Sequence, residues 1–189
     1  GNITSTGAFS TTGDVNLAAN ITTTDTNLTI GGNLVIAEAA TPTLSTGAGT
    51  AGNVLVSGTT NGTTGGVAET LTVQAGTGTA TFTGNVGNNA NGTELEALTI
   101  TNAAATTFSG TLDLANALTQ TNAATGTTTF TGAVAVGSAD LKGTAYALNN
   151  SFASGGTTSI TNSGTVTKNA TGNITSTGAF STTGDVNLA

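Results

Sequence analysis

The sequence predicts an all-β protein folded as a parallel β-solenoid, a right-handed β-helix with about seven coils in each 171-residue repeat. Three observations predict this fold class: a long unchanged repeat, a shorter periodicity of the phenylalanines, and a composition that favours strands and turns. Threonine makes up about a quarter of the 189 residues, and the chain has 28 glycines and one proline. Threonine suits strands and Gly and Asn suit turns, whereas the strong helix formers Lys, Arg and Met are scarce or missing.

The longest repeat joins the two ends of the chain. The string from Gly1 to Ala18 recurs without a change from Gly172 to Ala189. A biased composition does not produce a match of this length, so the sequence is interpreted as one period of a tandem array followed by the opening of the next. We therefore expect residues 1–171 to form one β-solenoid repeat unit and residues 172–189 to start the next identical repeat in the same continuous solenoid.

A shorter repeat becomes visible when the chain is aligned on its phenylalanines. From Phe82 onward, successive Phe residues are about 22 to 28 positions apart, which predicts a coil of about two dozen residues. Phe82 and Phe130 lie between threonines, and Thr-Phe-Thr is the out-in-out pattern of a strand with one buried face. We expect one structural core column formed by Phe9, Phe82, Phe108, Phe130, Phe152 and Phe180.

Pairs of apolar residues separated by one residue recur between the aromatics, as in Val54 and Val56 or Leu71 and Val73. This period-two pattern predicts short strands of about three to five residues. Gly or Asn soon follows most pairs and predicts corners with positive φ, so the asparagines are interpreted as corner residues or amide ladders. Outward threonines are expected to form ladders from coil to coil.

One coil buries too little apolar surface to offset its ordering entropy, which predicts that coils stack. At a spacing of about 4.8 Å, seven coils would give a repeat roughly 34 Å long. The preference of parallel crossover connections predicts a right-handed coil. The expected partners are adjacent repeats of the same or identical chains placed end to end, with lateral self-association as a further possibility.

Two strings carry a resemblance to a known group of proteins: Thr79 to Val86 (TATFTGNV) and Gly126 to Val134 (GTTTFTGAV). They resemble the Thr-, Gly- and Asn-rich β-strand repeats of giant bacterial surface proteins, including filamentous-haemagglutinin-type adhesins and autotransporter passengers. The resemblance implies a long right-handed β-helix at the cell surface or beyond, working in adhesion, cell contact or an extracellular matrix. The Asn-Pro-rich secretion caps of that family are absent from this sequence, which leaves the export route open.

Composition excludes several classes of function. The net charge is −7 and the only basic side chains are Lys142 and Lys168, too few to bind the phosphate backbone of a nucleic acid. The chain has no His and no Cys, and Ser/His or Cys/His catalytic pairs cannot be built from it. We expect no enzyme activity, no cofactor, no metal and no nucleic-acid partner. We also expect no transmembrane segment, because no apolar run is long enough to cross a bilayer as a helix.

The few acidic residues and the threonines leave alternatives open. Glu94 and Glu96 form the best candidate for a catalytic pair of the β-helix lyase kind, yet neither has a basic residue nearby. Weak calcium sites would need the isolated carboxylates of Asp14, Asp25, Asp113 and Asp140. The main alternative function is a carbohydrate- or ice-binding β-helix module of a surface adhesin, with surface glycan as its partner.

Overall fold

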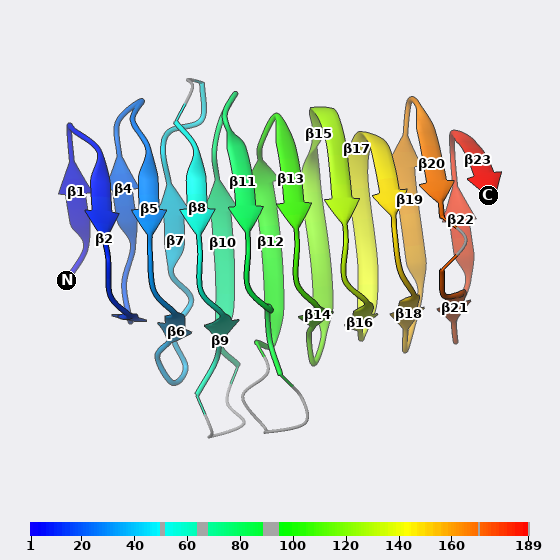
Figure 1. The fold of residues 1–189 in the computed structure, drawn as a ribbon, viewed down its shortest axis with the longest axis horizontal. Helices are drawn as coiled ribbons and strands as arrows, with labels where there is room; N and C mark the ends of the chain where they lie inside the picture. The colour runs from blue at the N-terminus through cyan, green and yellow to red at the C-terminus, as the bar shows by residue number, and fades with distance from the viewer. Residues whose placement is uncertain (50–51, 64–67, 89–94, 170, 189) are drawn as a thin grey trace.

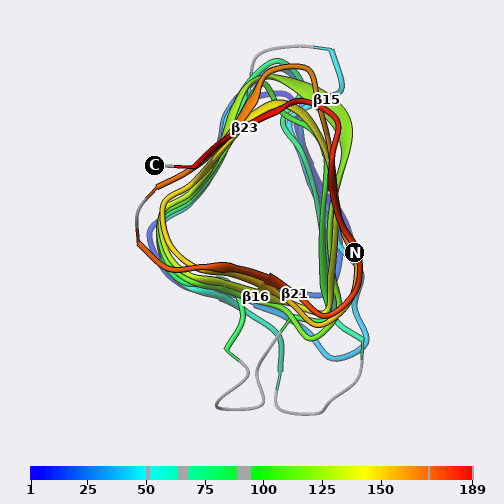
Figure 2. The same ribbon diagram turned by 90° about the vertical axis from the view of Figure 1, so that its right-hand side faces the viewer.

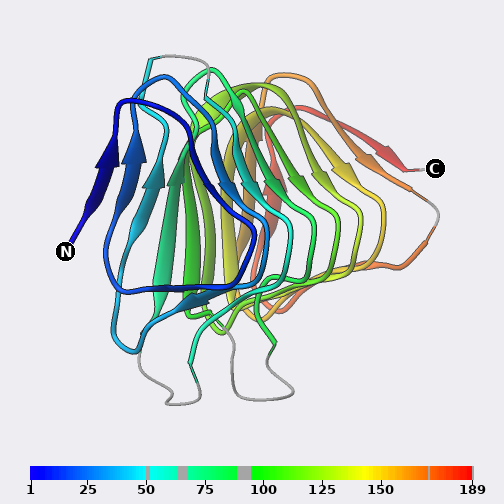
Figure 3. The same ribbon diagram turned by 60° about the vertical axis from the view of Figure 1, so that its left-hand side comes forward.

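The computed structural model is a right-handed parallel β-solenoid with a triangular cross-section, and the described residues contain no helix. It describes residues 1–49, 52–63, 68–88, 95–169 and 171–188. Figure 1 shows the coils side by side along the long axis, with the two termini at opposite ends. Figure 3 shows the chain climbing one side of each coil, crossing the top, descending the second side and returning along the bottom. The all-β, right-handed solenoid expected from the sequence is thus confirmed.

Each coil contributes to three faces, and the strands of each face pair in parallel. The first face holds β1 (Ile3–Ser5), β4 (Ile21–Thr23), β7 (Thr43–Ser45), β10 (Thr70–Gln74), β12 (Ala97–Asn102), the starts of β15 (Ala117–Phe130) and β17 (Ser138–Leu148), β19 (Thr158–Asn162) and β22 (Phe180–Thr182). The second face holds β2 (Phe9–Thr11), β5 (Leu28–Ile30), β8 (Val54–Val56), β11 (Thr79–Phe82), β13 (Ala105–Phe108), the ends of β15 and β17, β20 (Thr165–Lys168) and β23 (Asp185–Leu188). The third face holds β3 (Val15–Leu17), β6 (Leu34–Ile36), β9 (Thr60–Asn61), β14 (Leu112–Asp113), β16 (Val134–Val136), β18 (Phe152–Ser154) and β21 (Ile174–Ser176).

The coils differ in length while their strands stay in register. On the first face one coil leads from Ile3 to its partner Ile21, and a much longer one leads from Leu44 to its partner Val73. Eight steps of this kind lead from residue 3 to residue 182, where β22 lies. Extra residues are accommodated at the corners, because the three faces have to supply the same strand pairing in every coil.

The core is one apolar column inside the triangle. Along β10, Leu71 and Val73 are fully buried, whereas Thr70 and Thr72 are partly exposed. The same alternation holds on the other faces, for example in β8 with Val54 and Val56. Because side chains in a strand alternate between its two faces, the apolar pairs of the sequence become the inner wall and the threonines the outer wall.

The phenylalanines form a shorter column than the sequence suggests. Phe82, Phe108 and Phe130 lie in register on the second face, and their rings stack with centroids 5.3 and 5.2 Å apart. Phe152 is buried on the third face and meets Phe130 edge-on at 5.8 Å.

The two terminal phenylalanines do not belong to this column. Phe9 lies on the second face in the row of Leu28, and Phe180 lies on the first face opposite Thr158. The prediction of one six-membered column is therefore wrong. Coils of unequal length place phenylalanines at similar sequence spacing on different faces.

Glycines of the corner between the second and third faces are required for close approach of the coils. The row comprises Gly32, Gly58, Gly84, Gly110 and Gly132, and it starts at Gly13 of the first coil, where a Cβ would meet no atom. A Cβ on Gly84 would lie 2.4 Å from the carbonyl oxygen of Gly58 in the coil below, and one on Gly132 would lie 2.3 Å from that of Gly110. Positive φ, which the sequence suggested for the corners, occurs among the described residues at other positions between strands: Gly47, Gly76, Gly87, Gly172, Asp25 and Ala39.

Asparagines at the corners link each coil to the next, which confirms their expected position. The Oδ1 atom of Asn27 accepts a hydrogen bond from the backbone N–H of Asn53 at 3.0 Å, and Oδ1 of Asn53 accepts one from Thr79 at 2.8 Å. At another corner, Oδ1 of Asn33 accepts from the N–H of Thr59 at 2.9 Å. These bonds satisfy backbone donors where the chain leaves one face for the next.

Candidate functional site at the ends of the solenoid

The described acidic residues among those singled out in the sequence form no metal-binding group. Glu94 lies outside the described residues, and Glu96 accepts a hydrogen bond from Nδ2 of Asn116 at 2.6 Å. Among the described residues, no group of three or more acidic side chains is placed to hold a metal ion. Asp14 instead accepts a corner hydrogen bond from the N–H of Asn33 at 2.7 Å.

Lysine 168 lies inside the solenoid, a position that the sequence analysis missed. It pairs with Leu148 below and Leu188 above and is 6% exposed. Its Nζ donates hydrogen bonds to the backbone carbonyls of Asn169, at 2.5 Å, and Thr171. The alternation Thr-Val-Thr-Lys from residue 165 gives Lys168 the same inward parity as Val166, and this pattern was the available signal.

A second polar group is buried in the middle of the core. The Nε2 atom of Gln120 donates to the carbonyl of Lys142 at 2.8 Å and to the hydroxyl of Tyr146 at 3.3 Å, while Oε1 accepts from Thr128 at 2.9 Å. Burial, with a smaller contribution from the carboxylate of Asp140, raises the pKa of Tyr146 well above its ordinary value. Tyr146 is 1% exposed, so the group stabilises the interior and offers no surface to a substrate.

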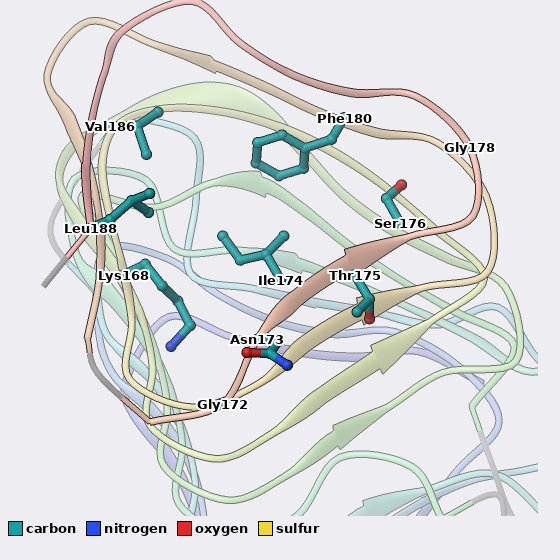
Figure 4. Close-up of a pocket in the computed structure, with 10 residues that line it drawn as sticks. All are labelled: Lys168, Gly172, Asn173, Ile174, Thr175, Ser176, Gly178, Phe180, Val186 and Leu188. Atoms are coloured by element: carbon teal, nitrogen blue, oxygen red, sulfur yellow. The ribbon is translucent and has the colours of Figure 1, made fainter.

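The C-terminal end of the solenoid is an open, apolar hollow of about 650 Å³. Figure 4 shows Ile174, Phe180, Val186 and Leu188 directed into the interior of the last coil. Phe180 and Val186 are 40% and 44% exposed and Leu188 is 72% exposed. Inward residues of the earlier coils, such as Val166, are buried by the coil above them. At this end, the inward apolar residues have no further coil to cover them.

The N-terminal end is also apolar. A depression of about 230 Å³ is lined by Ile3, Val15, Leu17 and Ile21 among others, and Ile3 is 44% exposed. The large exposed apolar side chains in the described part of the chain are Ile3 at this end and Phe180, Val186 and Leu188 at the other. In this part of the chain, the large apolar side chains that reach solvent are thus found at the two ends of the solenoid.

Two glycines of the first coil face open space, although their copies in the last coil are tightly packed. A Cβ on Gly7 or Gly13 would have no atom within 4 Å. Their copies in the last coil are different: a Cβ on Gly178 would lie 2.9 Å from Gly156, and one on Gly184 would lie 2.3 Å from the carbonyl oxygen of Gly164. In the last coil these glycines allow close contact with the coil before it. The first coil has glycines at the same positions, and the surface that they form is uncovered.

The sides of the rod carry little charge. Lys142 and Asp140 form an ion pair of 3.8 Å on the first face, and both side chains are about half exposed. An exposed pair of this kind contributes little to stability. No helix in the described residues is long and apolar enough to span a membrane.

These features define a class of protein: a three-sided, right-handed parallel β-solenoid whose large exposed apolar side chains, among the described residues, lie at its two ends. In comparisons with known proteins, no protein-family model, curated protein or solved structure matches this chain. Its function is therefore inferred from its geometry.

Proposed function

We propose that this chain is a segment of a structural or adhesive extracellular filament built from tandem β-solenoid repeats. The observation that carries the proposal is the shape of the two ends. Gly7 and Gly13 provide room for a preceding coil, and Phe180, Val186 and Leu188 provide the inner wall for a following one. Each end is also a set of strand edges on all three faces, which offer backbone groups to another strand.

The rest of the molecule supports a role as a rod. Its core is apolar and continuous, its corners are tied by asparagine hydrogen bonds, and no acidic cluster occurs among the described residues. A solenoid of this kind gains stability with each added coil because every inner residue is covered by the next one. A long array is therefore a stiff spacer, which suits a cell-surface or extracellular location.

The proposal predicts that the 189-residue chain associates end to end. Static light scattering should show a molar mass that rises with concentration, because burial of the end residues removes apolar surface from water. Val186→Lys should shift this association to at least tenfold higher concentration, since it places a charge in the hollow. Asn187→Lys is the matched control: it adds the same charge at the neighbouring outward position and should associate like the parent chain.

A strictly monomeric chain at millimolar concentration would contradict the filament. Equal effects of Val186→Lys and Asn187→Lys would show that association uses the sides rather than the ends.

The carbohydrate- or ice-binding alternative receives less support from the outer surface. One row of threonines runs along four successive coils of the first face, through Thr43, Thr72, Thr99 and Thr119. The next outward row on that face mixes Ser45, Gln74 and Asn102, so a second regular rank of hydroxyls is missing there. Phe82, Phe108 and Phe130 are buried and cannot stack on a sugar.

A further inference from the structure

The 18-residue sequence that occurs twice lies on different faces of the solenoid in its two copies. Each strand of the second copy lies one face earlier in the winding than its counterpart in the first copy. The changes run from the first face to the third (Ile3 and Ile174), from the second to the first (Phe9 and Phe180) and from the third to the second (Val15 and Val186).

The first coil can occupy any face because its three sides are equal. Ile3, Phe9, Val15 and Ile21 follow one another at equal intervals in the sequence, so one coil consists of three similar sides. Both copies keep the same parity. In the first copy the apolar strand residues pair with the buried Ile21, Leu28 and Leu34, and their counterparts in the second copy point into the last coil (Figure 4). The solenoid therefore fixes which side chains of this sequence point inward, but the sequence fits on any of the three faces.

The length of the repeat fixes which face the second copy takes. Eight full turns from Ile3 return the chain to the first face at β22. The repeat instead returns the sequence of Ile3 at Ile174 in β21, which lies on the third face, immediately before β22. One repeat therefore completes about seven and two-thirds turns. This is slightly more than the seven coils expected, and it falls short of eight full turns by one face of the triangle.

The last coil presents the surface that would carry this rotation forward. In the structure residues 19–36 cover the first copy: the N–H of Asn20 donates to Oδ1 of Asn2 at 3.2 Å, and that of Asn33 donates to Oδ1 of Asp14 at 2.7 Å. The second copy carries the same acceptors at Asn173 and Asp185, both of them exposed. A further copy of residues 19–36 would find the same strands and the same acceptors there, turned by one face.

We propose that each 171-residue repeat is turned about the solenoid axis by one face, a third of a turn, relative to the repeat before it. The inference rests on the proposed tandem filament. The interaction surface is the open coil of residues 172–188, and its partner is the next copy of residues 19–36. Equivalent features return to the same side after three repeats, roughly 110 Å along the axis at about 4.8 Å per coil. The filament then presents every surface feature on all three sides in turn.

Disulfide cross-linking within the single chain tests the rotation. The chain has no cysteine, so introduced pairs react without competition. Ala153 and Thr175 are in register on neighbouring coils of the third face, where a strand spacing of about 4.8 Å suits a disulfide. Ala153→Cys with Thr175→Cys should therefore close under mild oxidation to the extent of the control pair Ala135→Cys with Ala153→Cys, which is in register further down the same face.

The competing pair is Ser159→Cys with Thr175→Cys. It would close if the second copy occupied the same faces as the first, because Thr175 would then lie on the first face beside Ser159. Closure of that pair, read by mass spectrometry of the linked peptides, would overturn the rotation while end-to-end association still supported the filament. Closure of the Ala153 pair in a chain that never associates would instead overturn the filament, and with it the array that the rotation describes.

Discussion

Phe108→Ala should lower the free energy of unfolding by about 3 to 5 kcal/mol, the range measured for truncation of a buried phenylalanine. Phe108 is 2% exposed and its ring lies between those of Phe82 and Phe130, stacked at 5.3 and 5.2 Å. The substitution leaves a cavity and removes both ring contacts. Chemical denaturation measures the loss, and hydrogen exchange should quicken first in the two neighbouring coils.

Phe180→Ala is the control for this change. Phe180 is 40% exposed on the last coil and has no coil above it, so its truncation should cost less than half as much. Unchanged melting of the Phe108 variant would mean that the ring column does not stabilise the rod.

Gly84→Ala should be nearly as destabilising, although it adds a single methyl group. The new Cβ would lie 2.4 Å from the carbonyl oxygen of Gly58 and 2.5 Å from its carbonyl carbon. Both are backbone atoms held by strand pairing, so the coils have to separate locally. We expect a loss at the upper end of the roughly 1 to 3 kcal/mol typical of overpacking, measured by thermal or chemical unfolding.

Gly13→Ala tests the same corner row without the clash. Gly13 belongs to the first coil, where a Cβ meets no atom within 4 Å and φ is not positive. The variant should be neutral or stabilised by about 0.4 to 1 kcal/mol, because alanine restricts the unfolded chain. Similar losses at Gly13 and Gly84 would contradict close coil stacking as the reason for glycine.

The strand pattern and the stacking of coils could be predicted from the sequence because they depend on local alternation. Leu71 and Val73 had to share a face, and one coil could not be stable alone. The membership of the phenylalanine column could not be predicted, since it depends on how many residues each corner takes up. Phe152 follows Phe130 at the same interval as Phe130 follows Phe108, yet it lies on a different face.

The role of the corner glycines could not be predicted from the sequence either. A sequence suggests positive φ for glycine, whereas Gly58 and Gly84 are needed for contact between successive coils, a full turn of the chain apart. Lys168 shows a related limit. Its inward parity was visible in the alternation, but its acceptors are the carbonyls of the corner that follows, whose path depends on the whole coil.

We propose that repeats of this chain continue one another as a single stiff solenoid. Electron cryo-microscopy of a chain with three consecutive 171-residue repeats measures this directly. We expect an unbroken three-sided rod roughly 110 Å long, with strands about 4.8 Å apart along its axis. Three separate globular particles joined by flexible linkers would contradict it.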